Sequence, residues 1–239
     1  MYWLERKLLP FMKMPILYED NHLLVVEKPV NIPVQGDKSG DQDLLTILKA
    51  DLKIRYNKPG NVYLGLVHRL DRPVGGVMVF AKTSKAASRL SDVIRRNKLE
   101  RKYIGIVRGN PRKKESKLEH YLYKDTKKNK VHAVAAHHKQ AKKAILEYKT
   151  IGSEEQLSLL SIKLHTGRAH QIRVQLSAIG CPLYGDQKYG QQVNRPGQQI
   201  ALWAHTLAFP HPTKREIMEF TSYPPQEYPW MLYEQIKKK

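Results

Sequence analysis

The first apolar segments of the chain predict a β-hairpin. A strand-like run begins at Ile16, a polar turn follows at residues 19–21, and residues 23–27 form a second run of aliphatic and β-branched side chains. Pro29 ends the second run, because proline has no backbone N–H for a sheet. The chain therefore opens on two short strands joined by a tight connection.

Helical spacing of apolar residues then predicts two helices. The first runs through the leucines of residues 44–52 and ends before Pro59. The second begins at Ser84, which we expect to be its N-cap. Between the two helices, apolar runs near residues 64–67 and 77–81 predict strands that flank a polar segment.

The second half of the chain is richer in strand signals. Strands are expected at residues 102–108 and 157–164, and alternating apolar and polar positions within residues 112–148 indicate antiparallel strands. Thr166-Gly167 is expected to open a helix that Gly180 closes. Many strands with few helices predict an α+β fold with a mixed, largely antiparallel central sheet and flanking helices.

Residues 15–239 show no linker and no internal repeat, so we expect one catalytic-size domain over this range. Residues 1–14 are broken by Pro10 and contain three methionines, and we expect them to form an extension outside the fold. A start at Met1, Met12 or Met14 fits this pattern equally.

The charge of the chain narrows its partners. It has 42 Lys plus Arg against 22 Asp plus Glu, a formal net charge of +20 and a pI near 9.9. Such an excess favours polyanions, and the absence of a long apolar span favours nucleic acid over a membrane. A basic surface that only keeps the chain in solution is the alternative that composition leaves open.

Cysteine usage and the N-terminal residues indicate a compartment. The single cysteine, Cys181, excludes an internal disulfide, and Glu5 and Arg6 interrupt any secretory apolar stretch. We therefore expect a cytoplasmic protein.

Lysines concentrate in residues 112–143, which we expect to face RNA. His132, His137 and His138 lie in or beside this segment, but no cysteine or spaced carboxylate completes a familiar ligand set. We therefore interpret them as surface histidines and expect no metal site.

The segment HRLDRPVGG, residues 68–76, places one carboxylate among basic neighbours. Asp71 is flanked by His68, Arg69 and Arg72. A free aspartate with a pKa of about 3.9 is already charged at neutral pH, so the flank is better suited to orient the carboxylate and to bind phosphate. A turn cap or a structural ion pair is the alternative reading of Asp71.

Further segments occur with it in a fixed order. After the opening YEDNHLLVVEKP (18–29) and HRLDRPVGG come RKYIGIVRG (101–109), HTGRAHQIRVQL (165–176), GDQKYG (185–190) and LWAHTLAFPHP (202–212). In order and spacing these motifs resemble the RluA-type RNA pseudouridine synthases over nearly the whole chain. A set of motifs in family order is far more specific than any one of them.

The resemblance implies an isomerase with the pseudouridine synthase fold. Asp71 matches the essential aspartate that acts on the target ribose, Tyr103 the tyrosine that stacks on the base and is implicated in proton removal, and Arg173 the arginine that pairs with the aspartate. Arg69 matches an arginine that fills the place of the flipped base. The matching motifs also supply the expected RNA-binding set: His68, Arg69, Arg72, Arg168, His170 and Gln171.

The chemistry agrees with these residue types. Isomerising uridine breaks the bond from nitrogen 1 to ribose carbon 1 and remakes it through carbon 5, so nothing is oxidised or added and no cofactor is expected. A carboxylate acts at the ribose, and an aromatic face retains the detached base. The target nucleotide has to leave the stack of structured RNA, ribosomal or transfer, and we expect a monomeric enzyme.

Several alternatives stay open at this stage. Val74-Gly75 stands where the family usually has Thr-Ser, which puts the bracing of the loop in doubt and leaves a catalytically silent RNA-binding or assembly factor as the second reading. A glycoside hydrolase would pair Asp71 with Asp186, although Asp186 fits a turn better. Tyr103 is alternatively a plain strand residue, and Arg173 a surface helix residue.

Overall fold

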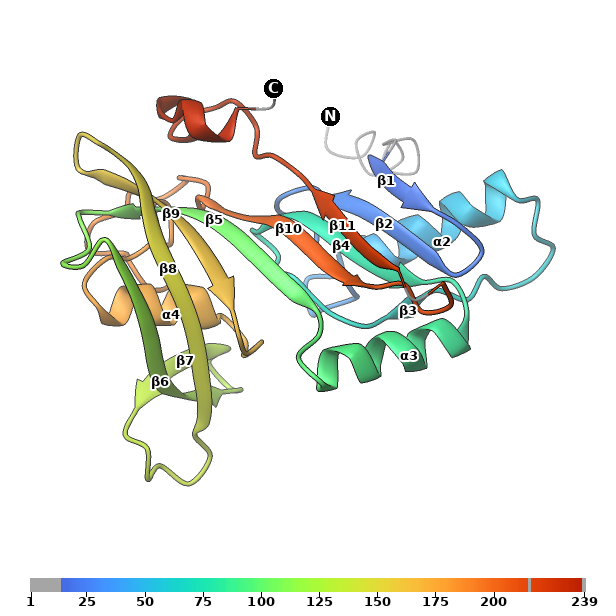
Figure 1. Ribbon diagram of the computed structural model, residues 1–239, viewed down its shortest axis with the longest axis horizontal. Coiled ribbons are helices and arrows are strands. Elements are labelled where there is room, and N and C mark those ends of the chain that lie inside the picture. The colour runs from blue at the N-terminus through green and yellow to red at the C-terminus, as the bar shows by residue number, and fades with distance from the viewer. Residues whose placement is uncertain (1–13, 215, 238–239) are drawn as a thin grey trace. The chain divides into compact units, whose positions relative to one another are not determined.

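The computed structural model describes residues 14–214 and 216–237, which divide into two compact units (Figure 1). The first unit contains the described residues up to Leu99 together with Ala208–Phe220, and the second contains Glu100–Leu207 and the described residues from Thr221 onward. Apart from Met14, the extension expected over residues 1–14 lies outside the described residues.

The first unit is built on short antiparallel strands: β1 (Ile16–Glu19), β2 (Leu23–Lys28), β3 (Gly65–Leu66) and β4 (Gly75–Ala81). β2 pairs antiparallel with both β1 and β4, and β3 pairs with β4. The predicted opening hairpin is therefore confirmed. β4 is buried along its whole length. The C-terminal end of the polar segment that precedes β4 is therefore held in place by a buried strand.

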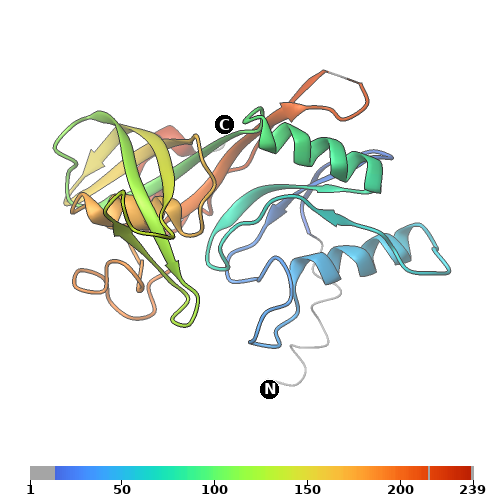
Figure 2. The same cartoon turned by 90° about the horizontal axis from the view of Figure 1, so that it is seen from below.

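Two capped helices complete this unit. In α2 (Leu44–Arg55) the Asp43 side chain accepts a hydrogen bond from the Thr46 N–H. α3 (Ser84–Arg95) packs beside β3 and β4 (Figures 1 and 2). Its N-cap is Thr83, whose hydroxyl accepts from the Ala86 N–H, so the expected cap at Ser84 was wrong by one residue.

The second unit contains a longer antiparallel sheet: β5 (Glu100–Arg108), β6 (Glu115–Asp125), β7 (Lys130–Val134), β8 (Lys142–Glu154) and β9 (Leu157–Leu164). The strands lie in the order β5-β9-β8-β6-β7. β6 and β7 form a hairpin whose turn is residues 126–129. The Lys-rich segment is therefore antiparallel sheet, as predicted.

α4 (Gln171–Ala178) packs beside β6 and β7. It begins later than the expected opening at Thr166-Gly167. The Thr166 hydroxyl instead bonds the Gln171 side chain and the Ile145 N–H, and so holds a bend ahead of the helix. The end is as predicted, because Gly180 has φ +79° just after the last turn, a conformation that glycine adopts without strain.

Two further strands follow α4 in the chain. Two 3-10 turns, η2 (Trp230–Leu232) and η3 (Glu234–Ile236), come after these strands. The strand β10 (Leu202–Pro210) contributes its first residues to the second unit and Ala208 onward to the first, and β11 (Ile217–Thr221) pairs with β10. The largely antiparallel strands and the helices beside them confirm the predicted α+β class.

Candidate functional site

Asp71 lies in the loop that joins β3 to β4. The residue is half-buried, and its backbone carbonyl accepts a hydrogen bond from the Val74 N–H at 3.0 Å, which closes a tight turn. The turn and the buried start of β4 together fix the path of the chain on the C-terminal side of Asp71.

Lys28, the last residue of β2, anchors this loop. Its side chain is fully buried, and its Nζ donates to the carbonyl oxygens of Pro29 at 2.8 Å, Arg72 at 3.0 Å and Val74 at 2.8 Å. Three carbonyl acceptors match the three hydrogens of an ammonium group. Lys28 therefore binds the backbone directly after Asp71.

The charge of Lys28 depends on its surroundings. Burial lowers its pKa to about 7, whereas the negative charge of Asp71 raises the pKa and the nearby Arg72 lowers it. A neutral amine has only two hydrogens, so the three hydrogen bonds require the protonated form. The protonation of Lys28 and the geometry of the Asp71 loop are therefore linked.

Arg72 braces the loop on its exposed side. Its Nε donates to the Asn31 carbonyl at 3.1 Å, and its two terminal nitrogens donate to the Ser39 hydroxyl at 3.1 Å and the Asp41 carboxylate at 2.5 Å. The guanidinium thus ties the Asp71 loop to the loop that precedes α2. These intramolecular hydrogen bonds compete with the phosphate contact expected of Arg72.

His68 is also used within the fold, since its Nε2 accepts a hydrogen bond from the Val79 N–H at 3.0 Å. Arg69, by contrast, has an exposed side chain. Val74 is buried in the core, and its carbonyl is one of the three bound by Lys28. Lys28 therefore braces the loop at Val74, where the resemblance put that bracing in doubt.

The other expected catalytic residues belong to the second unit. Tyr103 lies on β5 opposite Ile162 of β9 and is only 8% exposed. Arg173 lies on α4 and is 7% exposed, so the alternative of a surface helix residue was wrong. Its Nε donates to Asp186 Oδ2 at 2.9 Å and a terminal nitrogen donates to Oδ1 at 2.8 Å. This is a buried, two-pronged ion pair.

Asp186 forms the predicted turn as well as this ion pair. Its Oδ1 accepts from the N–H groups of Lys188 at 2.9 Å and Tyr189 at 3.1 Å, and its side chain is fully buried. A carboxylate engaged in this way is poorly placed to act as the acid or base of a hydrolase. The paired-carboxylate alternative therefore loses its second member.

The residues just before α4 hold one another. Gln171 is buried; its Oε1 accepts from the Thr166 hydroxyl at 2.7 Å and the Arg168 N–H at 3.0 Å, and its Nε2 donates to the Ile145 carbonyl at 3.0 Å. Arg168 is exposed, and its Nε donates to the Lys143 carbonyl at 3.0 Å. Gln171 therefore shapes the bend, and Arg168 is the more accessible of the two to RNA.

His170 stands at the start of α4 in the left-handed region with φ 51°, and its Nδ1 lies 2.6 Å from the Tyr189 hydroxyl. Of the residues expected from sequence, the first unit thus holds His68, Arg69, Asp71 and Arg72, and the second holds Tyr103, Arg168, His170, Gln171 and Arg173.

Basic side chains cover the β6–β8 region of the second unit. The exposed ones are Arg112, Lys113, Lys114, Lys117, Lys124, Lys127, Lys128, Lys139, Lys142, Lys143 and Lys149. His132, His137 and His138 are exposed among them, as expected of surface histidines. Within residues 14–214 and 216–237, no group of three or more His, Cys, Asp or Glu residues is arranged to hold a metal ion.

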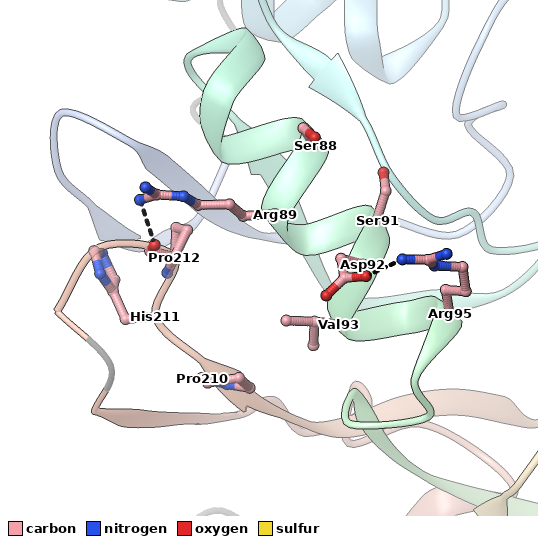
Figure 3. A pocket seen from close by; sticks show the side chains of 9 residues that line it. All are labelled: Ser88, Arg89, Ser91, Asp92, Val93, Arg95, Pro210, His211 and Pro212. Carbon is pink, nitrogen blue, oxygen red and sulfur yellow. Dashed lines mark hydrogen bonds and ion pairs between the residues drawn. The ribbon is translucent and has the colours of Figure 1, made fainter.

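A hollow of about 670 Å³ lies between α3 and residues 210–212 of the first unit (Figure 3). Arg89 and Arg95 line it, but the first donates to the Pro212 carbonyl at 2.8 Å and the second pairs with Asp92. Its lining shares no residue with the Asp71 loop.

Within the part of the chain described here, no helix is both long and apolar enough to span a bilayer.

Sequence reasoning missed two residues that hold the site. Lys28 falls inside a matched motif, and a lone lysine at the end of a buried strand was the available signal. Asp186 was interpreted as a turn residue, and the sequence carries no sign that its partner is Arg173, which lies on another element.

Comparison with known proteins agrees with this picture. A family model described as RNA pseudouridylate synthase matches residues 22–178. An uncharacterized RNA pseudouridine synthase of Aquifex aeolicus is 34% identical over 226 residues, which cover 89% of this chain and 70% of the relative. Ribosomal large subunit pseudouridine synthase D of Haemophilus influenzae is 32% identical over 232 residues, with coverage of 89% and 68%.

Solved structures show the same fold. The structure of human RNA pseudouridylate synthase domain containing 4 superposes with a TM-score of 0.77 at 23% identity, covering 95% of this chain and 94% of that one. Human RNA pseudouridylate synthase domain containing 1 gives a TM-score of 0.72 at 21% identity, with coverage of 90% and 84%.

Proposed function

The chain belongs to the RNA pseudouridylate synthase family, and on that premise we propose that it isomerises specific uridines of structured RNA with Asp71 as its catalytic carboxylate. The observation that carries this proposal is the clamp on the Asp71 loop. A fully buried lysine binds three backbone carbonyls beside a half-buried aspartate. Such support keeps a reacting side chain in its productive position and orientation.

Each residue has a distinct role in this reaction. The Asp71 carboxylate attacks ribose carbon 1 or stabilises positive charge there while the bond to nitrogen 1 breaks. Tyr103 stacks on the detached uracil and takes part in removing the proton from carbon 5, and Arg173 orients the Asp71 carboxylate. Rotation of the uracil then allows carbon 5 to bond to the ribose.

The RNA is gripped electrostatically. The exposed lysines of the β6–β8 region offer cations to several neighbouring phosphates, and the target nucleotide flips out of its stack to reach Asp71. Because the Haemophilus influenzae relative is named for the large ribosomal subunit, ribosomal RNA is the first substrate to test and transfer RNA the second. We expect a monomer, working in the cytoplasm.

The test begins by mapping pseudouridines in ribosomal and transfer RNA from cells with and without the protein. The RNA that loses a modification is then incubated with purified wild type and with Asp71→Asn, a change that keeps the volume of the side chain and removes its charge. We expect no isomerisation by the variant, with RNA affinity within about twofold of wild type because phosphate contacts dominate binding.

Asp51→Asn, a partly exposed aspartate on α2 of the same unit, is the matched control and should keep full activity. Full activity of Asp71→Asn would remove Asp71 from the mechanism. Wild-type protein that binds RNA and leaves every uridine unchanged would favour the silent binding factor, and release of free uracil would favour a hydrolase.

A further inference from the structure

The 185–190 segment, GDQKYG, connects the expected catalytic arginine to the Lys-rich hairpin. At one point of the segment Asp186 holds Arg173 by two hydrogen bonds of 2.9 and 2.8 Å. The Tyr189 ring lies against the same guanidinium, with its centroid 5.1 Å from Arg173 Cζ. Carboxylate and ring therefore fix the guanidinium from two directions.

The same tyrosine reaches the hairpin. The Tyr189 hydroxyl accepts a hydrogen bond from the Val131 N–H of β7 at 2.9 Å and lies 2.6 Å from His170 Nδ1. Its ring packs against a buried apolar cluster formed by Leu122, Val131, Ala144 and Val174. These residues come from β6, β7, β8 and α4, so Tyr189 joins the hairpin to the helix that carries Arg173.

Lys188 makes a second connection to the hairpin. Its Nζ donates to the carbonyl of Asn129 at 2.9 Å, and Asn129 is the last residue of the turn between β6 and β7. Asn129 has φ 45°, so the position of this carbonyl depends on a conformation that few residues adopt. The exposed Lys127 and Lys128 lie in the same turn.

We propose that Asp186 and Tyr189 are positioning residues that hold Arg173 in register with the β6–β7 hairpin, so that RNA seated on the hairpin lysines is aligned with the arginine. This inference rests on the proposed function, because it assigns the arginine and the hairpin to one reaction. In this proposal the 185–190 segment acts through Arg173 and the hairpin rather than by contacting the base or the ribose.

Geometry gives the reason for such a link. The hairpin and α4 are separate elements, and a shift of about 1 Å between a gripping surface and a catalytic group costs up to about 10² in rate. Hydrogen bonds from one short segment to both elements limit that shift. A loss of the link should therefore slow the reaction while leaving the phosphate contacts in place.

The test compares two Tyr→Phe variants in the full chain. Tyr189→Phe removes the hydroxyl that joins β7 to His170 and keeps the ring on Arg173. Tyr148→Phe is the matched control: it is a buried tyrosine of the same unit, and it loses a hydroxyl that donates to the Lys113 carbonyl at 3.2 Å, away from Arg173. The probe is the unmodified RNA that mapping identifies in cells without the protein.

We expect the single-turnover rate of Tyr189→Phe at saturating RNA to fall by about tenfold, with the half-saturating RNA concentration changed by less than about twofold. Tyr148→Phe should match wild type in both. A wild-type rate in Tyr189→Phe, an equal slowing in both variants, or a loss confined to RNA affinity would each overturn the proposal. Should Tyr189→Phe not fold, Lys188→Met replaces it, with a smaller slowing expected and a wild-type rate contradicting the link.

A measurement without RNA separates this inference from the proposed function. In Arg173→Lys, which loses the two-pronged pair with Asp186, the Val131 amide proton should exchange with solvent several-fold faster than in wild type, since fast exchange reports local opening. Unchanged exchange at Val131 would overturn the link even if the enzyme proved active. An inactive wild-type enzyme with faster exchange in the variant would count against the proposed function alone.

Discussion

The Asp71 loop of the first unit and the Arg173 helix of the second hold the side chains proposed to be catalytic in different ways. All three hydrogens of Lys28 go to backbone carbonyls, so Lys28 acts on Asp71 through the shape of the loop and through its charge. Arg173 is held directly at its guanidinium, because two of its N–H groups donate hydrogen bonds to the Asp186 carboxylate.

The two arrangements differ in what they tolerate. The Arg173 guanidinium meets the buried Asp186 carboxylate through two N–H groups, whereas Lys28 has a pKa inside the physiological pH range. A lysine whose pKa lies near 7 changes its charge within that range. The comparison teaches that the support of the Asp71 loop includes a titrating lysine, whereas the support of Arg173 is a buried, two-pronged ion pair.

Removing the clamp should have the largest effect. Lys28→Met keeps an unbranched chain of similar length and leaves three carbonyls without a donor, and at about 1 kcal/mol or more each we expect a loss of at least about 3 kcal/mol of unfolding free energy. The single-turnover rate should fall by about 10²-fold, because the loop no longer holds the Asp71 carboxylate in position. Urea unfolding and rate measurements on the same preparation check both.

Lys82→Met serves as the control for this change. Lys82 belongs to the same unit and pairs with Glu19, away from the Asp71 loop, so it should keep its catalytic rate. If Lys28→Met retained both wild-type stability and rate, the clamp would be irrelevant and the contrast between the two units would disappear.

The same two regions show what the sequence could predict. The opening hairpin and the strands at 77–81 and 157–164 follow from local runs of apolar and β-branched residues and were predicted correctly. The roles of Lys28 and Asp186 depend on partners outside their own elements. Lys28 binds the carbonyls of Arg72 and Val74, which are 44 and 46 residues away, and no local pattern encodes such a contact.

The predicted starts of two helices were wrong for a related reason. Thr83 and Ser84 are both good N-caps, and only the backbone conformation decides that Thr83 is the residue outside the helix. At α4, Thr166 has the chemistry of a cap, but its hydroxyl bonds Gln171 and β8 instead. Competing partners of one side chain are invisible in a single sequence.

The titration of Lys28 is the second test of the contrast. The pKa is about 7 in the folded chain against 10.5 as its ordinary value, so between these pH values the unfolded chain binds the extra proton and this group's contribution to stability rises with pH. The loop nevertheless loses its third hydrogen bond as the proton leaves. We therefore expect the single-turnover rate to decline as pH rises through about 7.

Nitrogen NMR of the Lys28 side chain measures this directly, and its midpoint should coincide with the decline in rate. The contacts of Arg173, followed through its Nε–H signal, should stay constant over the same range. A Lys28 midpoint above about 9, near the ordinary lysine value, would show that the clamp does not titrate in the working range.

The smallest expected effect concerns which unit grips the RNA. Lys127 and Lys128 are exposed in the β6–β7 turn of the second unit, whereas Arg89 and Arg95 in the hollow of the first unit already bind Pro212 and Asp92. Engaged arginines have less to gain from a phosphate than exposed lysines. We therefore expect the phosphate contacts that govern affinity to come from the hairpin.

The measurement is the slope of the logarithm of the association constant against the logarithm of salt concentration. The double variant Lys127→Ala/Lys128→Ala should flatten this slope by about 0.7 to 0.9 for each phosphate that the hairpin no longer neutralises, while Arg89→Ala/Arg95→Ala should leave it unchanged. Both variants remove two positive charges, so a general effect of net charge would alter both slopes equally. A flattened slope in the arginine variant alone would move the RNA grip from the hairpin to the hollow beside α3, and the link through Tyr189 would then have no RNA to align.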